Sequence, residues 1–90
     1  MRSFETYKRK ALAKPGIREE YEKLAPEFAV ARVLIAARLD AKMTQGEVAR
    51  RMGTSQSAVA RMEAGRTLPS TTSLVKYAKA LGRKLAIELV

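Results

Sequence analysis

The sequence contains no cysteine and no histidine. Without cysteine the chain can form neither a disulfide nor a thiolate metal site. Without histidine it lacks the side chain best suited to acid–base catalysis near neutral pH. Most hydrolytic and metal-dependent mechanisms are therefore improbable, and we expect a protein that is not an enzyme, with no metal and no cofactor.

The chain also lacks a long apolar run. Its longest apolar stretch, FAVARVLIAA, is ten residues long and is interrupted by Arg32, whereas a membrane-spanning helix needs about 20 apolar residues. The beginning, MRSFETYKRK, has no apolar segment of the kind found in secretory signals. We therefore expect a cytoplasmic protein, and 90 residues are enough for one domain.

Acidic residues are few. The chain has 18 Lys and Arg against 9 Asp and Glu, a net charge of +9. Residues 1–25 hold seven basic and four acidic residues, and residues 26–90 hold eleven and five, so the excess is spread over both parts. This balance favours a polyanionic partner such as nucleic acid. Charge by itself is also compatible, though less so, with a basic surface that binds nothing.

The middle of the chain carries the pattern of an amphipathic helix. Pro26 suits the first turn of a helix. Apolar residues then recur at helical spacing through residues 27–39, which predicts a helix with one buried face. The positions that follow this spacing are Phe28, Ala31, Leu34, Ile35, Arg38 and Leu39.

Two short helices are expected next, joined by a Met-Gly-Thr turn. Thr44 and Glu47 have the spacing of a capping box, and Gly53 can supply the positive φ that the turn needs. Ser55 is expected to cap the second helix and Gly65 to stop it. This order predicts a helix-turn-helix motif. The residues expected to face inward are Val48, Ala49 and Met52 on the first helix, and Val59 and Met62 on the second.

A further helix and a tail complete the chain. Ser70 or Thr71 is expected to cap a helix that ends at Gly82. The residues expected to be buried on it are Leu74, Val75, Ala78 and Leu81. The tail RKLAIELV alternates apolar and polar residues, which predicts a strand over residues 83–90 that pairs with another chain. The alternative is that the last helix continues into a frayed end.

The second helix of the motif leaves a polar face outward. Such a face can enter the major groove of DNA, with its N-terminal residues nearest the base edges. The side-chain amide of Gln can pair with the donor N6 and the acceptor N7 of adenine. The guanidinium of Arg can donate to O6 and N7 of guanine. In isolation Gln56 would fit equally well as a solvated residue at a helix start. The outward residues are Gln56, Ser57, Ala60, Arg61 and Ala64.

The start of the first motif helix is a candidate phosphate site. The side-chain amide of Gln45 and the free backbone N–H groups of the first turn can together hold a phosphate oxygen. Ser55, Arg66 and Ser70 are further phosphate candidates. Arg50 and Arg51 face outward at the far end of that helix and fit solvated charge better than DNA contacts.

These residues resemble a known family. The segment MTQGEVARRMGTSQSAVARMEAGRTLPS, followed by LVKYAKALG, is similar to the Cro/CI-type (XRE) helix-turn-helix domain of lambda-like repressors. The resemblance implies an all-α, lambda-repressor-like bundle over residues 26–82. It also implies a phosphate contact at Gln45 and base contacts at Gln56, Ser57 and Arg61.

The resemblance further implies an ion pair. Arg38 and Glu63 would form a largely buried pair that holds the first helix of the domain to the recognition helix. Such a pair is weak evidence for net stability, but loss of one partner strands a buried charge. Ala60 departs from the family pattern, because many relatives carry a longer polar side chain there, and fewer base contacts would follow.

Nearly the whole chain is similar to HigA-like antitoxins of type II toxin–antitoxin modules. The segment KALAKPGIREEYEKLAPEFAVARVLIAAR ahead of the motif and the short tail after it carry this second resemblance. It implies an antitoxin that represses its own operon and neutralises a small RelE/HigB-like ribonuclease. We also expect a homodimer, because two recognition helices about 34 Å apart would read a pseudo-palindromic operator. The alternatives are a stand-alone phage-type or housekeeping repressor, a bridging transcription factor, and a small basic ribonuclease.

Residues 1–25 are not needed by a domain of this kind, so we expect a helical extension that contacts a partner. Two short helices are predicted, at 4–13 and 16–25, on either side of Pro15-Gly16. Alternatively, Ile17, Tyr21 and Leu24 pack on the protein's own helices. The three consecutive basic residues at 8–10 either add contacts to DNA phosphates or are simply solvated. The candidate partner contacts are Phe4, Tyr7, Leu12 and Tyr21.

Overall fold

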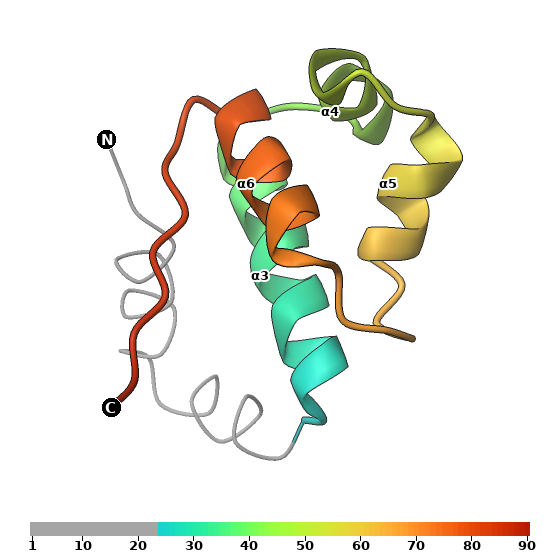
Figure 1. Ribbon diagram of the computed structural model, residues 1–90. Coiled ribbons are helices and arrows are strands. Elements are labelled where there is room, and N and C mark those ends of the chain that lie inside the picture. Colours follow the sequence, from blue (N-terminus) through green and yellow to red (C-terminus); the bar gives the residue numbers. More distant parts are fainter. Residues whose placement is uncertain (1–23) are drawn as a thin grey trace.

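The computed structural model describes residues 24–90, and these residues form four helices (Figure 1). The helices predicted at 4–13 and 16–25 lie outside the described residues, except for the end of the second. Ala25 is the N-cap of the next helix, so a helix at 16–25 cannot reach its predicted last residue. Helix α3 runs through the middle of the bundle with α6 along it, and α4 and α5 lie at one end and one side. The predicted all-α bundle is confirmed.

Helix α3 spans Pro26–Asp40, close to the predicted 27–39, with Pro26 in its first turn. Its buried residues are Ala31, Val33 and Leu34. Phe28 and Leu39, predicted to be buried, are 50% and 60% exposed, which corrects the predicted face. Both lie near the ends of the helix, which spans Pro26–Asp40. The covered stripe instead includes Val33, because α6 and the tail pack on that side.

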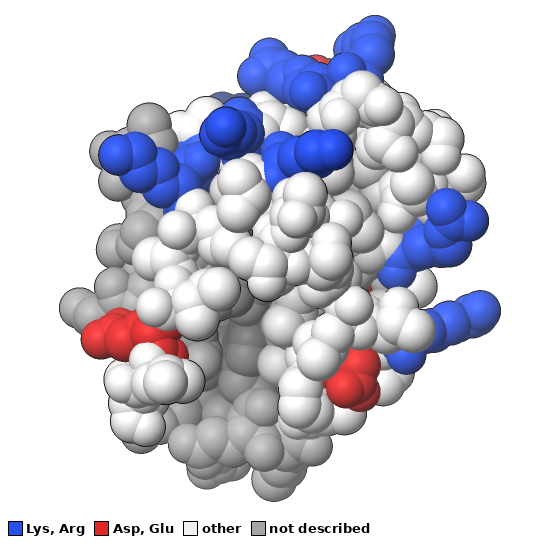
Figure 2. All heavy atoms as spheres, in the orientation of Figure 1, with Lys and Arg blue, Asp and Glu red and all other residues white. Residues whose placement is uncertain are grey.

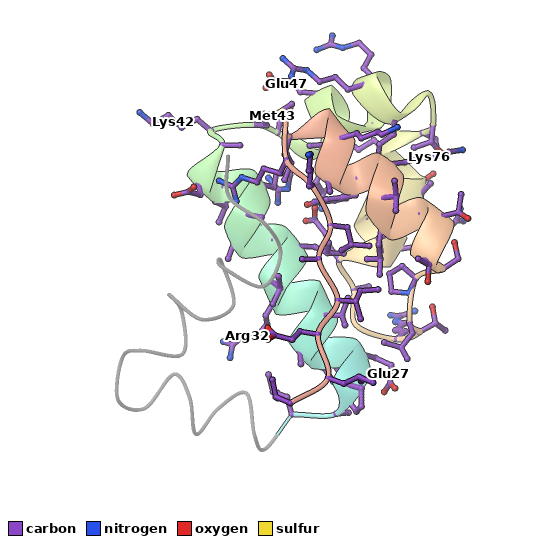
Figure 3. The ribbon with its side chains drawn as sticks, turned by 60° about the vertical axis from the view of Figure 1, so that its left-hand side comes forward. Glu27, Arg32, Lys42, Met43, Glu47 and Lys76 are labelled. Atoms are coloured by element: carbon purple, nitrogen blue, oxygen red, sulfur yellow. The ribbon has the colours of Figure 1, made fainter. Side chains whose placement is uncertain are left out.

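The connection from α3 to α4 contains a residue in an uncommon conformation. Lys42 has a φ of 57°, the left-handed conformation that Gly and Asn usually adopt. The backbone N–H of Met43 then donates to the carbonyl oxygen of Arg38 at 3.2 Å, which closes the end of the helix. This places Met43 in the core, in the short turn between α3 and α4 (Figure 3).

Helices α4 (Gln45–Met52) and α5 (Gln56–Met62) begin where their caps were predicted. The hydroxyl of Thr44 accepts from the backbone N–H of Glu47 at 3.1 Å, and the Glu47 carboxylate accepts from the backbone N–H of Thr44 at 3.2 Å. The Ser55 hydroxyl accepts from the backbone N–H of Ala58 at 3.1 Å. Helix α5 ends at Met62, three residues earlier than the predicted stop at Gly65.

Helix α6 (Thr71–Ala80) is capped by Ser70, whose hydroxyl accepts from the backbone N–H of Ser73. Val75, predicted to be buried, is 36% exposed, while Leu74 and Leu81 pack against the core as predicted. The most buried residue of this helix is Tyr77, which is 1% exposed.

The tail does not form the predicted strand. Within residues 83–90 only Lys84 has the geometry of a β-bridge, and residues 85–90 have no regular secondary structure. A strand persists only where a neighbour supplies a ladder of hydrogen bonds, and residues 24–90 contain no second strand. Nor does the tail continue α6, because Gly82 has a φ of 72° and turns the chain. Arg83 then forms an ion pair with Asp40 that holds the start of the tail against α3.

One core joins all four helices. It is formed by side chains of α3, the turn after it, α4, α5 and α6, so each helix depends on the others for burial. Its buried members are Leu34, Met43, Val48, Ala49, Val59, Tyr77 and Ala80. No helix among residues 24–90 is both long enough and apolar enough to span a membrane.

The turn between α4 and α5 generates a prediction. Gly53 has a φ of 71°, and no atom lies within 4 Å of the position that a Cβ would occupy. Gly53→Ala therefore meets no steric clash, and only the left-handed backbone opposes it, at about 1–2 kcal/mol of unfolding free energy. Urea denaturation followed by circular dichroism measures the loss.

The matched variant is Gly53→Asn, because Asn tolerates the left-handed region better than Ala. We expect Gly53→Asn to lose clearly less stability than Gly53→Ala. Equal losses in the two variants would show that the backbone conformation of this residue is not the cause.

Candidate nucleic-acid interface

Helices α4 and α5 pack through small and apolar residues and leave one face of α5 open. Val48 and Val59 are fully buried between them, and Ala49 is 3% exposed. On the opposite side of α5, Gln56, Ser57 and Arg61 are exposed. The residues predicted to face inward are buried or half-buried, and those predicted to face outward are exposed except for the half-buried Ala60. An exposed helix of this kind can lie in a major groove.

The starts of α4 and α5 lie next to each other. Gly46, in the first turn of α4, has no side chain, and the Oε1 atom of Gln56 is 3.8 Å from where its Cβ would be. The structure thus brings the two predicted glutamines, Gln45 and Gln56, to the same end of the motif. At 3.8 Å a Cβ at this position would be in ordinary van der Waals contact with Gln56, so the two helix starts are close but not crowded.

The predicted phosphate contacts occupy different environments. The half-buried Gln45 donates from Nε2 to the carboxylate Oε1 of Glu63 at 3.1 Å, so part of its amide is already used within the protein. Ser55 and Ser70 serve as helix caps, and both hydroxyls are exposed. Arg66 is exposed in the loop between α5 and α6.

A buried carboxylate connects this surface to the core. Arg38 forms a two-pronged ion pair with Glu63, with Nε to Oε2 and Nη2 to Oε1 both at 2.9 Å. The Nη1 atom of Arg38 also donates to the carbonyl oxygen of Met43 at 3.0 Å. Glu63 is only 8% exposed, so the ion pair implied by the family resemblance is present and largely buried.

Tyr77 also binds the Glu63 carboxylate, and the sequence analysis did not predict this contact. The hydroxyl of Tyr77 lies 2.7 Å from Glu63 Oε2 and 2.9 Å from the carbonyl oxygen of Leu34. It has one proton to donate, and the ionised carboxylate is the stronger acceptor. The sequence contained a signal for this role, because Tyr77 lies three residues after Leu74 and four before Leu81, on the inner face of its helix.

These contacts shift the ionisation of each group. Burial by itself would raise the pKa of Glu63, but the hydrogen bonds from Arg38, Tyr77 and Gln45 outweigh burial and lower that pKa below its ordinary value. The hydrogen bond to Glu63 raises the pKa of Arg38. Burial, together with the hydrogen bond to Glu63, raises the pKa of Tyr77. Near neutral pH the cluster is therefore a carboxylate held by a guanidinium, a phenol and an amide.

Basic side chains accompany the open face. In Figure 2 the Lys and Arg side chains gather along the upper and right-hand edges of the molecule, where Figure 1 places the end of α6, α4 and α5. The only carboxylate of the segment from Gln56 to Arg66 is Glu63, and it is buried and neutralised. The outer face of α5 therefore presents amide, hydroxyl and guanidinium groups to an anionic partner.

A family model described as helix-turn-helix matches residues 34–87, which include the end of α3 and all of α4, α5 and α6. No significant match was found among curated proteins or among solved structures. The chain belongs to the helix-turn-helix family, as a DNA-binding domain of the Cro/CI (XRE) type. It is a DNA-binding regulator, and α5 is the second helix of its motif, the position that the recognition helix has in such domains.

The carboxylate cluster generates a pH-dependent prediction. Glu63→Gln leaves Arg38 buried without its counter-charge, so we expect a loss of about 3–5 kcal/mol in unfolding free energy at neutral pH. Because the folded pKa of Glu63 lies below 4.5, the stability that its ionisation contributes is present above pH 4.5 and is lost as the pH falls through the folded pKa. The difference between wild type and Glu63→Gln should therefore shrink on acidification, as measured by urea denaturation across pH.

Two controls isolate the effect. The pKa of Glu47 is also lowered, by its hydrogen bonds with Thr44. In a Glu47→Gln background, the Glu63→Gln substitution should still cost less unfolding free energy at low pH than at neutral pH. The double variant Arg38→Met with Glu63→Met removes both charges and should lose less stability than Glu63→Gln. A difference between wild type and Glu63→Gln that stays constant down to low pH would contradict the assignment.

Proposed function

We propose that the protein is a sequence-specific repressor that acts as the antitoxin of a type II toxin–antitoxin module. It binds a pseudo-palindromic operator as a homodimer, represses its own operon and neutralises a small RelE/HigB-like ribonuclease. It performs no catalysis. The observation that carries the DNA-binding part is the exposed face of α5, which has Gln56, Ser57 and Arg61 outward and its one carboxylate buried.

In this proposal base contacts come from α5 and phosphate contacts from its surroundings. Gln56 pairs with an adenine and Arg61 with a guanine, because their donor and acceptor geometry matches those base edges. Ser57 supplies an additional hydrogen bond to a base edge. The phosphate contacts come from Gln45, Ser55, Arg66 and Ser70, which surround the recognition helix in sequence.

The segment that precedes the family match supports the proposed antitoxin role. The match begins at residue 34, and the preceding segment carries Phe4, Tyr7, Leu12 and Tyr21, the candidate toxin contacts, which lie outside the described residues. Aromatic residues of this kind are common at protein interfaces. The resemblance to HigA-like antitoxins extends over this segment. Dimerisation is proposed because two recognition helices about 34 Å apart would match one DNA turn.

The DNA contacts are tested by two glutamine variants. Gln56→Ala should lower affinity for the operator by about 1–3 kcal/mol and relax selectivity at one base pair. It should leave binding to random duplex DNA unchanged. Gln45→Ala should instead weaken binding to all duplexes by a similar factor, because phosphates carry no sequence information. Fluorescence anisotropy on a duplex selected from a random pool, and on random DNA, measures both.

Salt dependence is the common control for these measurements. The slope of log affinity against log salt should be steep for the wild type, at about −0.9 per phosphate neutralised. If Gln56→Ala weakens random and selected DNA equally, it does not contact a base. A flat salt response of the wild type would contradict the DNA-binding mode itself.

The antitoxin role is tested by co-expression with the products of the adjacent reading frames, followed by affinity purification. We expect a stable complex with a small protein that arrests growth when expressed without this chain. The double variant Phe4→Ala with Tyr7→Ala should lose that complex and keep DNA binding, whereas Lys8→Ala should keep both. If no neighbour binds and none is toxic, the protein is a stand-alone repressor.

A further inference from the structure

The side chain of Tyr77 is buried and yet carries a polar group. It is 1% exposed, and its ring belongs to the core that joins all four helices. A phenylalanine would fill nearly the same space, and a buried hydroxyl costs free energy unless it is hydrogen-bonded. The hydroxyl of Tyr77 lies 2.7 Å from Glu63 Oε2 and 2.9 Å from the carbonyl oxygen of Leu34. Its proton therefore serves a specific contact inside the protein.

The Glu63 carboxylate uses both of its oxygens fully. An ionised carboxylate offers about four acceptor positions, two on each oxygen. Oε2 accepts from Arg38 Nε at 2.9 Å and from the Tyr77 hydroxyl. Oε1 accepts from Arg38 Nη2 at 2.9 Å and from Gln45 Nε2 at 3.1 Å. Each oxygen thus has two donors, and loss of the Tyr77 hydroxyl would leave Oε2 with one donor fewer and let the carboxylate shift.

The position of the carboxylate controls the orientation of the Gln45 side chain. A carboxylate accepts hydrogen bonds and cannot donate them, so the amide turns Nε2 rather than Oε1 toward Glu63. One of the two N–H groups of the amide is then engaged at Glu63. The other is the only side-chain donor that Gln45 can still offer to a phosphate oxygen. Because the amide is planar, the bond to Glu63 also sets the direction of this second N–H group.

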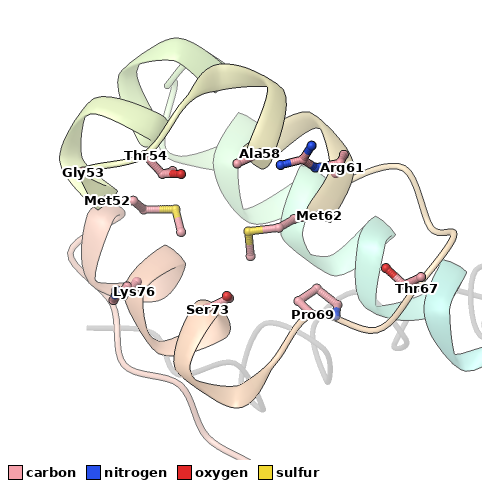
Figure 4. Close-up of a pocket in the computed structure, with 10 residues that line it drawn as sticks. All are labelled: Met52, Gly53, Thr54, Ala58, Arg61, Met62, Thr67, Pro69, Ser73 and Lys76. Atoms are coloured by element: carbon pink, nitrogen blue, oxygen red, sulfur yellow. The ribbon is translucent and has the colours of Figure 1, made fainter.

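Helices α5 and α6 leave a gap between them on the outer side of the motif. The gap is a hollow of about 370 Å³ (Figure 4), lined by Arg61 and Met62 from α5 and by Lys76 from α6. The residue that follows Met62 is the buried Glu63. The residue that follows Lys76 is the buried Tyr77. Their hydrogen bond therefore connects the end of α5 to α6 on the buried side of a gap that side chains do not fill.

We propose that Tyr77 is a positioning residue for DNA binding, whose hydroxyl holds the Glu63 carboxylate so that the Gln45 amide is directed toward a DNA phosphate. The hydroxyl acts through two hydrogen bonds, its own to Glu63 and that of Gln45 to Glu63, and does not touch DNA. Helix α6 thereby contributes to the phosphate contact at the start of α4. This inference rests on the proposed function, because it concerns the phosphate contact assigned there to Gln45.

Tyr77→Phe tests the role of the hydroxyl, since it keeps the ring in the core. On a duplex of random sequence, we expect the full-length variant to bind about two- to tenfold more weakly than the wild type, the range for one hydrogen bond. The slope of log affinity against log salt should stay at the wild-type value, because no charge is removed. Fluorescence anisotropy at several salt concentrations measures both.

A double-mutant cycle with Gln45→Ala separates positioning from a general loss of structure. In the Gln45→Ala background, Tyr77→Phe should have no further effect on DNA affinity, because the group that it orients is gone. Val33→Ala is the matched control, since it removes buried apolar volume and none of the hydrogen bonds to Glu63. It should lower stability and leave DNA affinity unchanged. Equal effects of Tyr77→Phe with and without the Gln45 side chain would overturn the inference.

Exchange of side-chain amide protons with water gives a second readout that does not involve DNA. In the wild type, the amide protons of Gln45 should exchange more slowly than those of the exposed Gln56. Tyr77→Phe should speed the exchange at Gln45 alone, as measured by NMR of the DNA-free protein. Unchanged exchange at Gln45, or a Tyr77→Phe protein that does not fold, would limit the hydroxyl to stability and would also overturn the inference.

The outcomes separate this inference from the proposed function. If Gln45→Ala weakens binding to random DNA and Tyr77→Phe does not, the inference is wrong and the phosphate contact of Gln45 stands. If Gln45→Ala leaves that binding unchanged, the phosphate contact of the proposed function fails, and the inference fails with it.

Discussion

The carboxylate of Glu63 is the interaction on which the rest of the structure depends. It follows the last residue of α5 and is reached by Arg38 from α3, by Gln45 from α4 and by Tyr77 from α6. One side chain therefore receives a hydrogen bond from each of the other three helices. Because these bonds are directional and the group is buried, they fix the end of the recognition helix relative to the whole bundle.

The same cluster determines the charge of the surface. An exposed glutamate at the end of α5 would repel a phosphate strand, but here the negative charge is turned inward and neutralised by Arg38. The outer face of α5 is left with amides, hydroxyls and Arg61. Gln45 connects the two regions, since its amide donates to Glu63 while it lies at the start of α4, beside the Gln56 side chain. The core thus orients a residue that we assign to phosphate.

Local signals in the sequence were sufficient for the helix boundaries near the motif. Thr44, Ser55 and Ser70 cap their helices as predicted, because a cap depends on contacts within four residues. Predictions that required a neighbour's position were less accurate. Phe28 and Leu39 have the right spacing for a buried face and yet remain half or more exposed, because spacing does not reveal how far the adjacent helices extend.

The sequence by itself determined the class of fold, the helix-turn-helix motif and the outward face of its second helix. These follow from helical periodicity and from caps, which are properties of short segments. The tertiary structure decided that Tyr77 and Gln45 join Arg38 at Glu63, that residues 83–90 form no strand, and that a hollow with Arg61 and Lys76 flanks α5. The first kind of contact joins residues that are distant in sequence and become neighbours only when the helices pack around one core. A strand, in turn, forms only where a second strand is available to pair with it.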